Sequence, residues 1–517
     1  MASQFFRTKS IDKLLSDAEE PEHRLRKTLG PWSLTALGIG AIIGAGIFVL
    51  TGTAAAGQKL NYHSLMAAPL LGVVLHGSHA IGTAGRPGAG PAIALSFFLV
   101  AIVCGLAGLC YAELASMIPI AGSAYTYTYA TLGELVAWII GWDLILEYAV
   151  SNMAVAVGYS AYFDSLLQNF GLKLPPKLSE PMLNSSLHFS GAYFNLPGFV
   201  VVMILTVILV VGIRESAGAN NFMVAVKILA ILIFIGWASG HIHPSNWTPF
   251  MPNGFQGVLT GGAIVFFTYI GFDSVSTAAE ECRNPQKDVP FGIIASLIVC
   301  TILYCSVAIV LTGIQNWQSL RNAAPVANAL AAIGLHRVER WVTIGALTGM
   351  LSSLLVFQLG QARVWFAMSR DGLLPRAFSK VHKKFRTPHI STWTAGFFVA
   401  IPAGIFNIGT LADLSNIGTL FAFLLVSLGV LILRRTQPER RRAFRVPWVP
   451  LIPIASVLCC LILMASLPVE TWLRFAIWLV IGLTIYFAYS RHHSEFAREN
   501  SENSGRDQVM QADLGEH

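Results

Sequence analysis

Four glycines that lie close together are the first residues whose type and spacing indicate chemistry. Gly38, Gly40, Gly44 and Gly46 belong to the stretch GIGAIIGAGIF, inside an apolar run from Trp32 to Leu50. Each glycine costs a helix about 1 kcal/mol relative to alanine. A helix broken inside a membrane frees N–H groups that bind a carboxylate and carbonyl groups that bind an ammonium or a cation. The alternative is helix packing, because Gly40 and Gly44 have the GxxxG spacing.

Four charged residues inside other apolar runs form the second candidate set. Asp143 and Glu147 are four residues apart, so that they share one face of a helix. Lys227 lies deep in its run, and Asp273 follows Gly271 in the middle of another. Charged residues in spanning segments are rare and indicate function by default. The alternative for each is a buried ion pair or a side chain that reaches back to the membrane surface.

The composition is that of a polytopic membrane protein. The 517 residues are 54% hydrophobic and 12% charged, with a mean hydropathy of +0.62, whereas soluble domains have about 25% charged residues. The net charge of +7 agrees with basic cytoplasmic loops and does not indicate a nucleic-acid partner. The cysteines lie in or beside apolar runs without metal-ligand spacing, so we expect neither disulfides nor a metal site.

Twelve stretches are long and apolar enough to cross a bilayer as helices, and we therefore predict an all-α fold with 12 transmembrane helices. Basic residues concentrate before the first stretch, at 370–386 and at 434–445. This asymmetry predicts that both termini are cytoplasmic. The stretches are approximately 32–52, 89–118, 131–163, 196–213, 220–240, 256–280, 290–313, 339–368, 392–408, 411–433, 448–467 and 471–490.

Residues 58–87 contain a further apolar piece that could be taken for a thirteenth span. One extra span would move the later basic clusters to the outside, so we interpret the segment as an external hairpin or a re-entrant piece. His63, His76 and His79 within it are a conceivable metal set. Because no Cys or carboxylate completes a ligand set, a polar loop is the favoured interpretation.

The sixth stretch carries the same kind of interruption as the first. It reads GGAIVFFTYIGFDSVSTAAEE, with Gly271 and Asp273 in its middle. Transporters built from inverted repeats have matching breaks five spans apart, with the substrate site between them. The pair of breaks is much more specific than either motif alone.

The chain resembles the amino acid–polyamine–organocation (APC) superfamily of transporters, close to the bacterial homologues of animal cationic amino acid transporters. The resemblance covers about residues 20–495 and implies a five-plus-five inverted repeat followed by two C-terminal helices. The matching stretches are GIGAIIGAGIFVLTG, CYAELASMIPIAGSAYTYTYATLGELVAWIIGWDLILEY, NWTPFMPNGF, FFTYIGFDSVSTAAEECRNPQKDVPFGI, SRDGLLP, NIGTLFAFLLVSLGVLILRRTQP and FRVPWVP.

Domain boundaries follow from the resemblance and the stretches together. We expect a cytoplasmic N-terminal tail at 1–31, a first repeat at 32–240, a second repeat at 256–433, the last two helices at 448–490 and a cytoplasmic C-terminal tail at 491–517. Segment 58–87 is extra relative to the short link of the family.

The resemblance also implies which residues bind substrate and couple transport to protons. The first break would be unwound at Gly44, Ala45 and Gly46, and their backbone N–H groups would hold a substrate carboxylate. Carbonyls of both breaks would hold its amino group, and Lys227, placed against the first span, would be the proton-coupling group. Glu147 and Asp273 are candidates for a charged pocket or relay. The residues assigned to the amino acid are Ile42, Gly44, Ala45, Gly46, Phe267, Thr268 and Ile270. Ala45 departs from the family, where many relatives have Ser or Thr.

The sequence thus predicts a secondary active transporter of L-amino acids in the plasma membrane. We expect coupling to protons and a substrate range that includes cationic and small neutral amino acids. No Walker-type phosphate loop or catalytic triad is present, so we expect no enzyme activity, no catalytic residues and no cofactor. Alternatives are an exchanger without proton coupling, a transport-dead receptor or assembly subunit, and a passive channel. A small membrane protein as a partner is left open.

Overall fold

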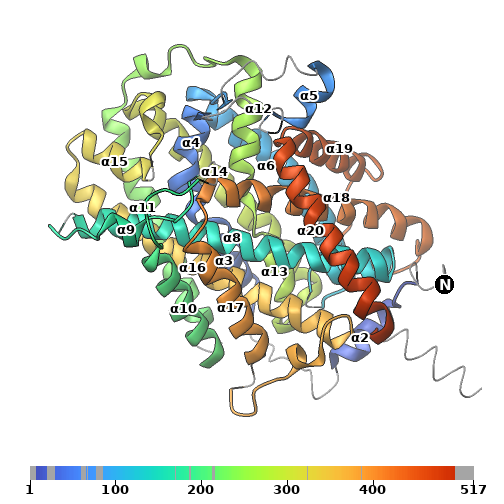
Figure 1. Ribbon diagram of the computed structural model, residues 1–517. Coiled ribbons are helices and arrows are strands. Elements are labelled where there is room, and N and C mark those ends of the chain that lie inside the picture. Colours follow the sequence, from blue (N-terminus) through green and yellow to red (C-terminus); the bar gives the residue numbers. More distant parts are fainter. Residues whose placement is uncertain are drawn as a thin grey trace, which may run out of the picture.

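The computed structural model describes residues 7–19, 29–59, 66, 68–76, 85–120, 122–168, 170–184, 188–211, 216–322, 324–385 and 387–494. Helices dominate this part of the chain (Figure 1). The longer helices are α2 (Ile11–Glu19), α3 (Pro31–Ile42), α6 (Ile93–Met117), α7 (Ala124–Thr131), α8 (Glu134–Gln168), α10 (Leu196–Val211), α11 (Ser216–Ala238), α12 (Gly254–Val265), α14 (Pro285–Ile314), α15 (Pro325–Ala332), α16 (His336–Arg370), α17 (His389–Ala403), α18 (Ile408–Thr436), α19 (Leu451–Ala465) and α20 (Val469–Ile485). The short ones are α4 (Thr51–Ala56), α5 (Leu70–His76), α9 (Pro176–Ser179), α13 (Ser274–Thr277) and α21 (Arg491–His493).

The prediction of an all-helical polytopic membrane protein is confirmed. Among the described residues, 9 helical runs are long and apolar enough to cross a membrane. α10 and α19 are shorter apolar helices, and α17 is a further short helix of 15 residues. Each of the twelve predicted stretches therefore contains a helix. The exact count and the inverted repeat remain predictions.

Helix α8 occupies the centre of the bundle (Figure 1). It packs against α7, α10, α16, α17, α18 and α20, and its apolar residues are buried on all sides, as expected for a helix that is hydrophobic all round. α3 is held between three other helices, α11, α14 and α16. These neighbours determine which side chains reach the glycine-rich stretch at the end of α3.

Residues 58–87 do not contain a thirteenth spanning helix in their described part. Strands β1 (Gln58–Lys59) and β2 (Gly85–Arg86) pair antiparallel, so that the two ends of the segment meet as a ribbon. Arg86 is buried and its Nη1 atom donates to Asp413 Oδ1 of α18 at 2.9 Å. α5 has only seven residues and lies beside the α19–α20 link, where the Leu70 N–H donates to the Leu467 carbonyl. His63 and His79 lie outside the described residues.

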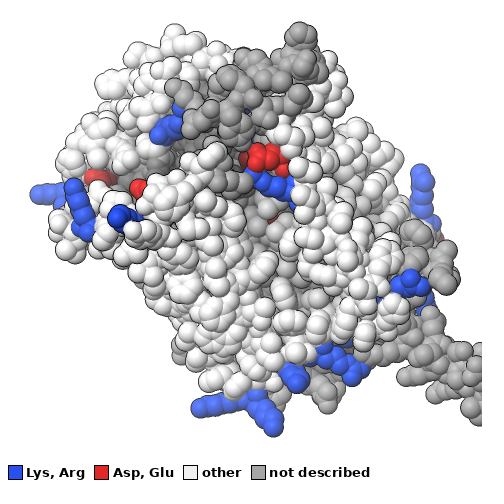
Figure 2. Space-filling model, in the orientation of Figure 1, with Lys and Arg blue, Asp and Glu red and all other residues white. Residues whose placement is uncertain are grey.

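The two ends of the described chain lie at the same end of the bundle, near the start of the α16–α17 link. Lys9 Nζ is 3.1 Å from Asp371 Oδ1, and a Cβ atom on Gly372 would lie 2.4 Å from the carbonyl oxygen of His493. An even number of spans requires this arrangement. Figure 2 shows Lys and Arg near the edges of one face and few charged side chains across its middle, as expected for a surface that meets lipid.

Candidate functional site

The first break lies between α3 and a π-helical turn, η1 (Gly46–Leu50), that continues into α4. The helix ends at Ile42, and Ile43 leaves the helical conformation with φ −81° and ψ 89°. Ile43 and Gly44 are the residues outside both helices, whereas Ala45 is helical and Gly46 begins the next turn. The expectation that Gly44, Ala45 and Gly46 are all unwound is therefore wrong for Ala45 and Gly46. They form the N-terminal end of the second half-helix.

The glycines of this stretch allow four different elements to approach it. A Cβ atom on Gly38 would lie 2.6 Å from Ser296 Oγ of α14, and one on Gly40 would lie 2.8 Å from Asn220 Oδ1 of α11. Glycine is needed at these positions because the neighbouring groups occupy the space of a side chain.

Gly44 and Gly46 meet two further elements at the break itself. A Cβ atom on Gly44 would lie 2.6 Å from Ser353 Oγ of α16, and one on Gly46 would lie 2.8 Å from the Cα atom of Thr268. Thr268 belongs to η7 (Phe266–Tyr269), the end of the upper half of the sixth span. This glycine motif therefore both packs closely against its neighbours and contains a helix break.

The second break follows η7 and ends where α13 begins at Ser274. Ile270 is extended, with φ −60° and ψ 136°, and Gly271 has φ +119°, a conformation that favours glycine. A Cβ atom on Gly271 would lie 2.8 Å from the Cβ atom of Ala41. The two breaks are thus in direct contact, and the predicted substrate residues of both spans come together.

The hydroxyl of Tyr304 from α14 connects the two breaks. Its oxygen lies 2.9 Å from the carbonyl oxygen of Ile42 and 2.9 Å from that of Thr268. These are two of the carbonyls that the sequence assigned to a substrate amino group. Phe267 and Ile270 are buried beside them, and the Ile270 N–H donates to the Phe267 carbonyl at 3.3 Å. The sequence did not indicate Tyr304, because a tyrosine in an apolar span is ordinary.

Lys227 of α11 is completely buried and lies against the first break. Its ammonium nitrogen donates to the carbonyls of Gly40 and Ile43 and to Ser352 Oγ of α16, each at 2.8 Å. An ammonium has three N–H donors, so these acceptors match it fully. The adjacent Ser353 hydroxyl donates to the Ala41 carbonyl at 2.8 Å. The sequence predicted Lys227 and its approach to the first span, but it did not identify the role of Ser352.

Glu147 and Asp273 are also buried, together with Asp143. Asp273 Oδ2 accepts a hydrogen bond from the Tyr148 hydroxyl at 2.7 Å. Neither carboxylate oxygen of Glu147 or Asp143 has a hydrogen-bond partner among the described residues, and the same holds for Asp273 Oδ1. These acids therefore do not form the buried ion pairs that were the alternative interpretation.

Two ion pairs close the end of the bundle at which α2 lies. Arg363 of α16 bonds Glu281 at 2.5 Å, just beyond α13. Lys9, which precedes α2, pairs with Asp371, and the other oxygen of Asp371 accepts from the Tyr125 hydroxyl at 2.5 Å. Glu281 and Asp371 lie in charge-rich loops of the kind that is usually solvated. Their partners Arg363 and Lys9 lie far away along the chain, so no local pattern reveals them.

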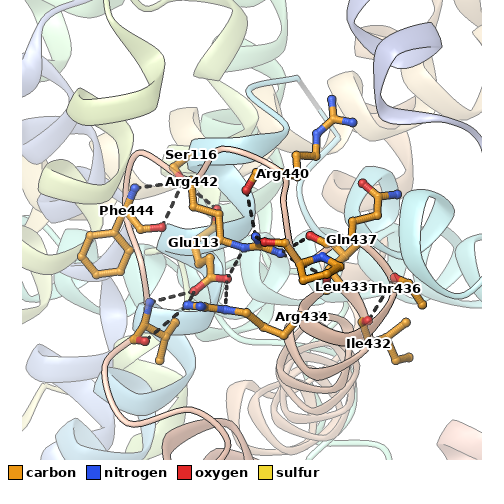
Figure 3. A network of polar contacts seen from close by, with 12 residues as sticks. Glu113, Ser116, Ile432, Leu433, Arg434, Thr436, Gln437, Arg440, Arg442 and Phe444 are labelled. Carbon is orange, nitrogen blue, oxygen red and sulfur yellow. Dashed lines mark hydrogen bonds and ion pairs between the residues drawn. The ribbon is translucent and has the colours of Figure 1, made fainter.

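A third polar network fixes the end of α18 against α6. Arg434 and Arg442 both converge on the buried carboxylate of Glu113, as Figure 3 shows. Arg434 approaches it with two hydrogen bonds of 2.8 and 2.7 Å. Arg442 also donates to the Leu433 and Gln437 carbonyls at 3.0 and 2.9 Å, which caps the C-terminal turn of the helix.

Comparison with known proteins shows similarity over nearly the whole chain. Residues 29–488 match the family described as amino acid permease. The chain is 46% identical to a methylthioribose transporter of Bacillus subtilis (strain 168), over 95% of this chain and 99% of that protein. It is 47% identical to the branched-chain amino acid permease BcaP of the same organism, over 96% and 99%. It is 34% identical to the vacuolar cationic amino acid transporter 4 of Arabidopsis thaliana, over 84% and 67%.

Proposed function

The chain belongs to the amino acid permease family of integral membrane transporters, and on that premise we propose that it carries L-amino acids across the plasma membrane by proton-coupled alternating access. Lys227 is the observation that carries this proposal. It links the broken first span to α11 and α16 by three hydrogen bonds of 2.8 Å. Both termini are cytoplasmic in this proposal.

Proton binding at Lys227 would control the position of the first span. The protonated side chain has three N–H donors for Gly40, Ile43 and Ser352, whereas the neutral amine has two. Loss of the proton leaves the amine unable to donate to Gly40, Ile43 and Ser352 together, and its bonds to the first span are no longer strengthened by a charge. One proton then shifts the equilibrium between two positions of the first span, which is sufficient for symport.

The same geometry argues against sodium as the coupling ion. A sodium ion between the first and eighth spans would need carbonyl and hydroxyl oxygens from both. Gly40, Ile43 and Ser352 would supply oxygens of this kind, but in this structure they accept hydrogen bonds from the ammonium of Lys227. Ammonium and sodium would compete for one position.

The substrate would bind where the two breaks meet. The N–H groups at the start of the second half-helix, at Gly44, Ala45 and Gly46, suit a carboxylate because a helix N-terminus is positive. The carbonyls of Ile42, Phe267, Thr268 and Ile270 suit an ammonium group. The Tyr304 hydroxyl bonds two of them, so that binding of the amino group would require this hydroxyl to give up its acceptors.

We propose a substrate range that includes at least one of arginine, lysine and ornithine together with small neutral amino acids. Asp273 lies in the second break and Glu147 precedes Tyr148, whose hydroxyl bonds Asp273, so these two acids would receive a cationic side chain. Two of the three named relatives are named for branched-chain and cationic amino acids and the third for methylthioribose, which supports an amino acid substrate without deciding its side chain.

Uptake by the purified protein in proteoliposomes tests this function. We expect uptake that is driven by an inward proton gradient, does not depend on sodium, and is competed by a cationic amino acid and by alanine. Leucine and methylthioribose serve as further competitors, because relatives are named for such substrates.

Each alternative predicts a different result in that assay. Strict dependence on sodium would show that the proton is not the coupling ion. If no cationic amino acid competes for uptake, the protein is a carrier of neutral amino acids. Exchange without gradient-driven accumulation would indicate an exchanger. Absence of saturable counterflow would indicate a receptor or a channel.

A further inference from the structure

A second buried charged set lies beside the broken sixth span and has no part in the proton coupling described above, although two of its members are proposed there to receive a cationic side chain. It consists of Asp143 and Glu147 on α8 and Asp273 before α13, none of them more than 1% exposed. Asp143 and Glu147 are one helical turn apart on α8, and the hydroxyl of Tyr148, the residue after Glu147, donates to Asp273 Oδ2 at 2.7 Å, so the three acids lie around one stretch of α8. We call these three residues the acid set.

The hydrogen bonding of the acid set is incomplete. Four carboxylate oxygens of Asp143 and Glu147 and one of Asp273 lack a hydrogen-bond partner among the residues that the structure describes. The fully buried hydroxyls of Tyr111 (α6) and Tyr127 (α7) also lack one there. The ring centroids of Tyr111 and Tyr127 are 6.1 Å apart, and Tyr111 also packs against Phe272, the residue before Asp273, at 5.8 Å. These hydroxyls and carboxylates therefore lie around the same stretch of the sixth span.

The elements around α8 supply no positive charge to this region within the described chain. α10 and α17 contain no Asp, Glu, Lys or Arg, and the charged pair of α20, Glu470 and Arg474, is bonded internally. On α16, Arg363 is paired with Glu281. The other arginines of this helix lie in its first two turns and its last turn, at Arg337, Arg340 and Arg370. Lys227 of α11 is bonded to the first span and to Ser352.

α18 brings a small residue to the acid set instead of a charge. A Cβ atom on Gly418 would lie 2.7 Å from Asp143 Oδ1, so that glycine gives this carboxylate its space. The next residue, Thr419, lies beside Glu147, and its hydroxyl donates to the Ser415 carbonyl at 3.0 Å.

Three neighbouring carboxylates in a region of low dielectric cannot all be ionised, because desolvation and mutual repulsion both oppose the charged forms. We propose that the acid set binds a proton that is separate from the Lys227 proton, and that Asp143 releases it to the cytoplasm during each transport cycle. In that step the O–H bond of a carboxylic acid breaks, the electron pair stays on the oxygen, and water accepts the proton. This inference rests on the proposed function.

Asp143 is the member of the acid set placed for release. It lies nine residues after Glu134, where α8 begins, or roughly 14 Å along the helix, whereas Glu147 lies about 6 Å further. With the proposed orientation, the start of α8 is cytoplasmic. Asp143 therefore lies between the acids near the break and the cytoplasmic end of the helix.

Counting coupled protons tests the proposal. In proteoliposomes at steady state, each coupled proton multiplies the substrate accumulation ratio by about ten per unit of pH gradient, because a tenfold ratio and one pH unit are the same free energy. We expect Asp143→Asn to retain counterflow and to accumulate about tenfold less substrate than the unmodified protein at a gradient of one pH unit. Asp164→Asn, an acid-to-amide change on the same helix, is the matched control and should leave accumulation unchanged.

Accumulation by Asp143→Asn equal to that of the unmodified protein would overturn the proposal. Loss of counterflow together with accumulation, in a variant whose thermal unfolding is unchanged, would also overturn it, because Asp143 would then serve substrate binding or movement. If the amide variant does not fold, Asp143→Ser is measured with the same expectations. Failure of the proposed function appears in the unmodified protein, as absence of proton-driven accumulation, and is thus distinct from these outcomes.

Discussion

Two groups of buried charge in this protein, Lys227 and the acid set, have opposite relations to their surroundings. Lys227 is fully enclosed and all three donors of its ammonium have acceptors at 2.8 Å. Glu147 is equally enclosed, but neither of its carboxylate oxygens has a hydrogen-bond partner among the described residues. Lys227 and Glu147 are therefore equally buried, and they differ in whether their polar atoms have hydrogen-bond partners.

The partners indicate what each group can do. A charged group with a full set of fixed acceptors has one preferred geometry, so that it fastens the elements that supply them. Carboxylates without donors are held neutral by protons or by a cation and exchange these readily. The comparison thus supports the two proposals, that Lys227 controls movement and that the acid set stores a proton.

Among the substitutions that compare Lys227 with the acid set, Lys227→Ala should have the largest effect on transport. It removes the ammonium donor of the Gly40 and Ile43 carbonyls, of which Gly40 keeps the Ser352 hydroxyl at 3.3 Å, and a buried group that loses its donor costs about 1–3 kcal/mol. The first span would lose its attachment to α11, and we expect proton-driven uptake to fall roughly 30-fold or more. Substrate binding, measured by thermal shift, should weaken less than transport.

The matched control for this change is Lys287→Ala, which removes an exposed lysine at the start of α14. Accumulation of substrate by Lys227→Ala after a pH jump would show that the lysine does not fasten the first span for coupling. The comparison between the two regions would then fail.

The sequence revealed the charged residues of both regions but not their difference in partners. A lysine or an aspartate in an apolar run is visible from composition alone, and Gly271 beside Asp273 indicated the second break correctly. The acceptors of Lys227 on the first span are 184 and 187 residues away along the chain. Only the packing of α11 against α3 and α16 determines that they meet, and no local pattern encodes this contact.

The first break shows why motif patterns locate a site only approximately. Gly46 was expected in the unwound part, yet it begins η1, and its missing side chain serves the contact with Thr268. Glycine marks both helix breaks and close approach, and the pattern cannot separate the two. Tyr304 was missed for the converse reason, since its hydroxyl acts at the site while its ring is an ordinary buried aromatic group.

Tyr304→Phe should have an intermediate effect, and it tests whether the Tyr304 hydroxyl and the substrate amino group compete for the same carbonyls. One hydroxyl hydrogen is shared between the Ile42 and Thr268 carbonyls, so its removal costs about 1–3 kcal/mol in the substrate-free protein. A substrate ammonium would then meet no competing hydroxyl at these carbonyls, and among the described residues only the Gly44 N–H, at 3.0 Å, would remain as a donor at Ile42. We expect a lower unfolding temperature without substrate and roughly tenfold tighter binding, measured by calorimetry.

Tyr162→Phe is the control for this change, because the Tyr162 hydroxyl also donates to a carbonyl of the first span, that of Phe48 at 2.7 Å. Phe48 is outside the predicted substrate residues, so its loss of a donor should not tighten binding. Equal changes of affinity in the two variants would contradict the assignment of the Ile42 and Thr268 carbonyls to the amino group.

Ser352→Ala should have the smallest effect and sharpens the comparison most, because it changes the partners of Lys227 without removing its charge. The ammonium would keep the Gly40 and Ile43 carbonyls and lose one acceptor at 2.8 Å. A single hydrogen bond to a charged group contributes about 1.5 kcal/mol or somewhat more, so proton-driven uptake should fall about tenfold. Counterflow at equal pH should fall less, because it needs no net release of the proton.

Ser353→Ala is the matched control on the same helix, since that hydroxyl donates to the Ala41 carbonyl and has no bond to Lys227. It should change both rates by the same factor. If Ser352→Ala also changes both rates equally, the third acceptor of Lys227 matters for packing alone, and complete hydrogen bonding no longer distinguishes the lysine from the acid set.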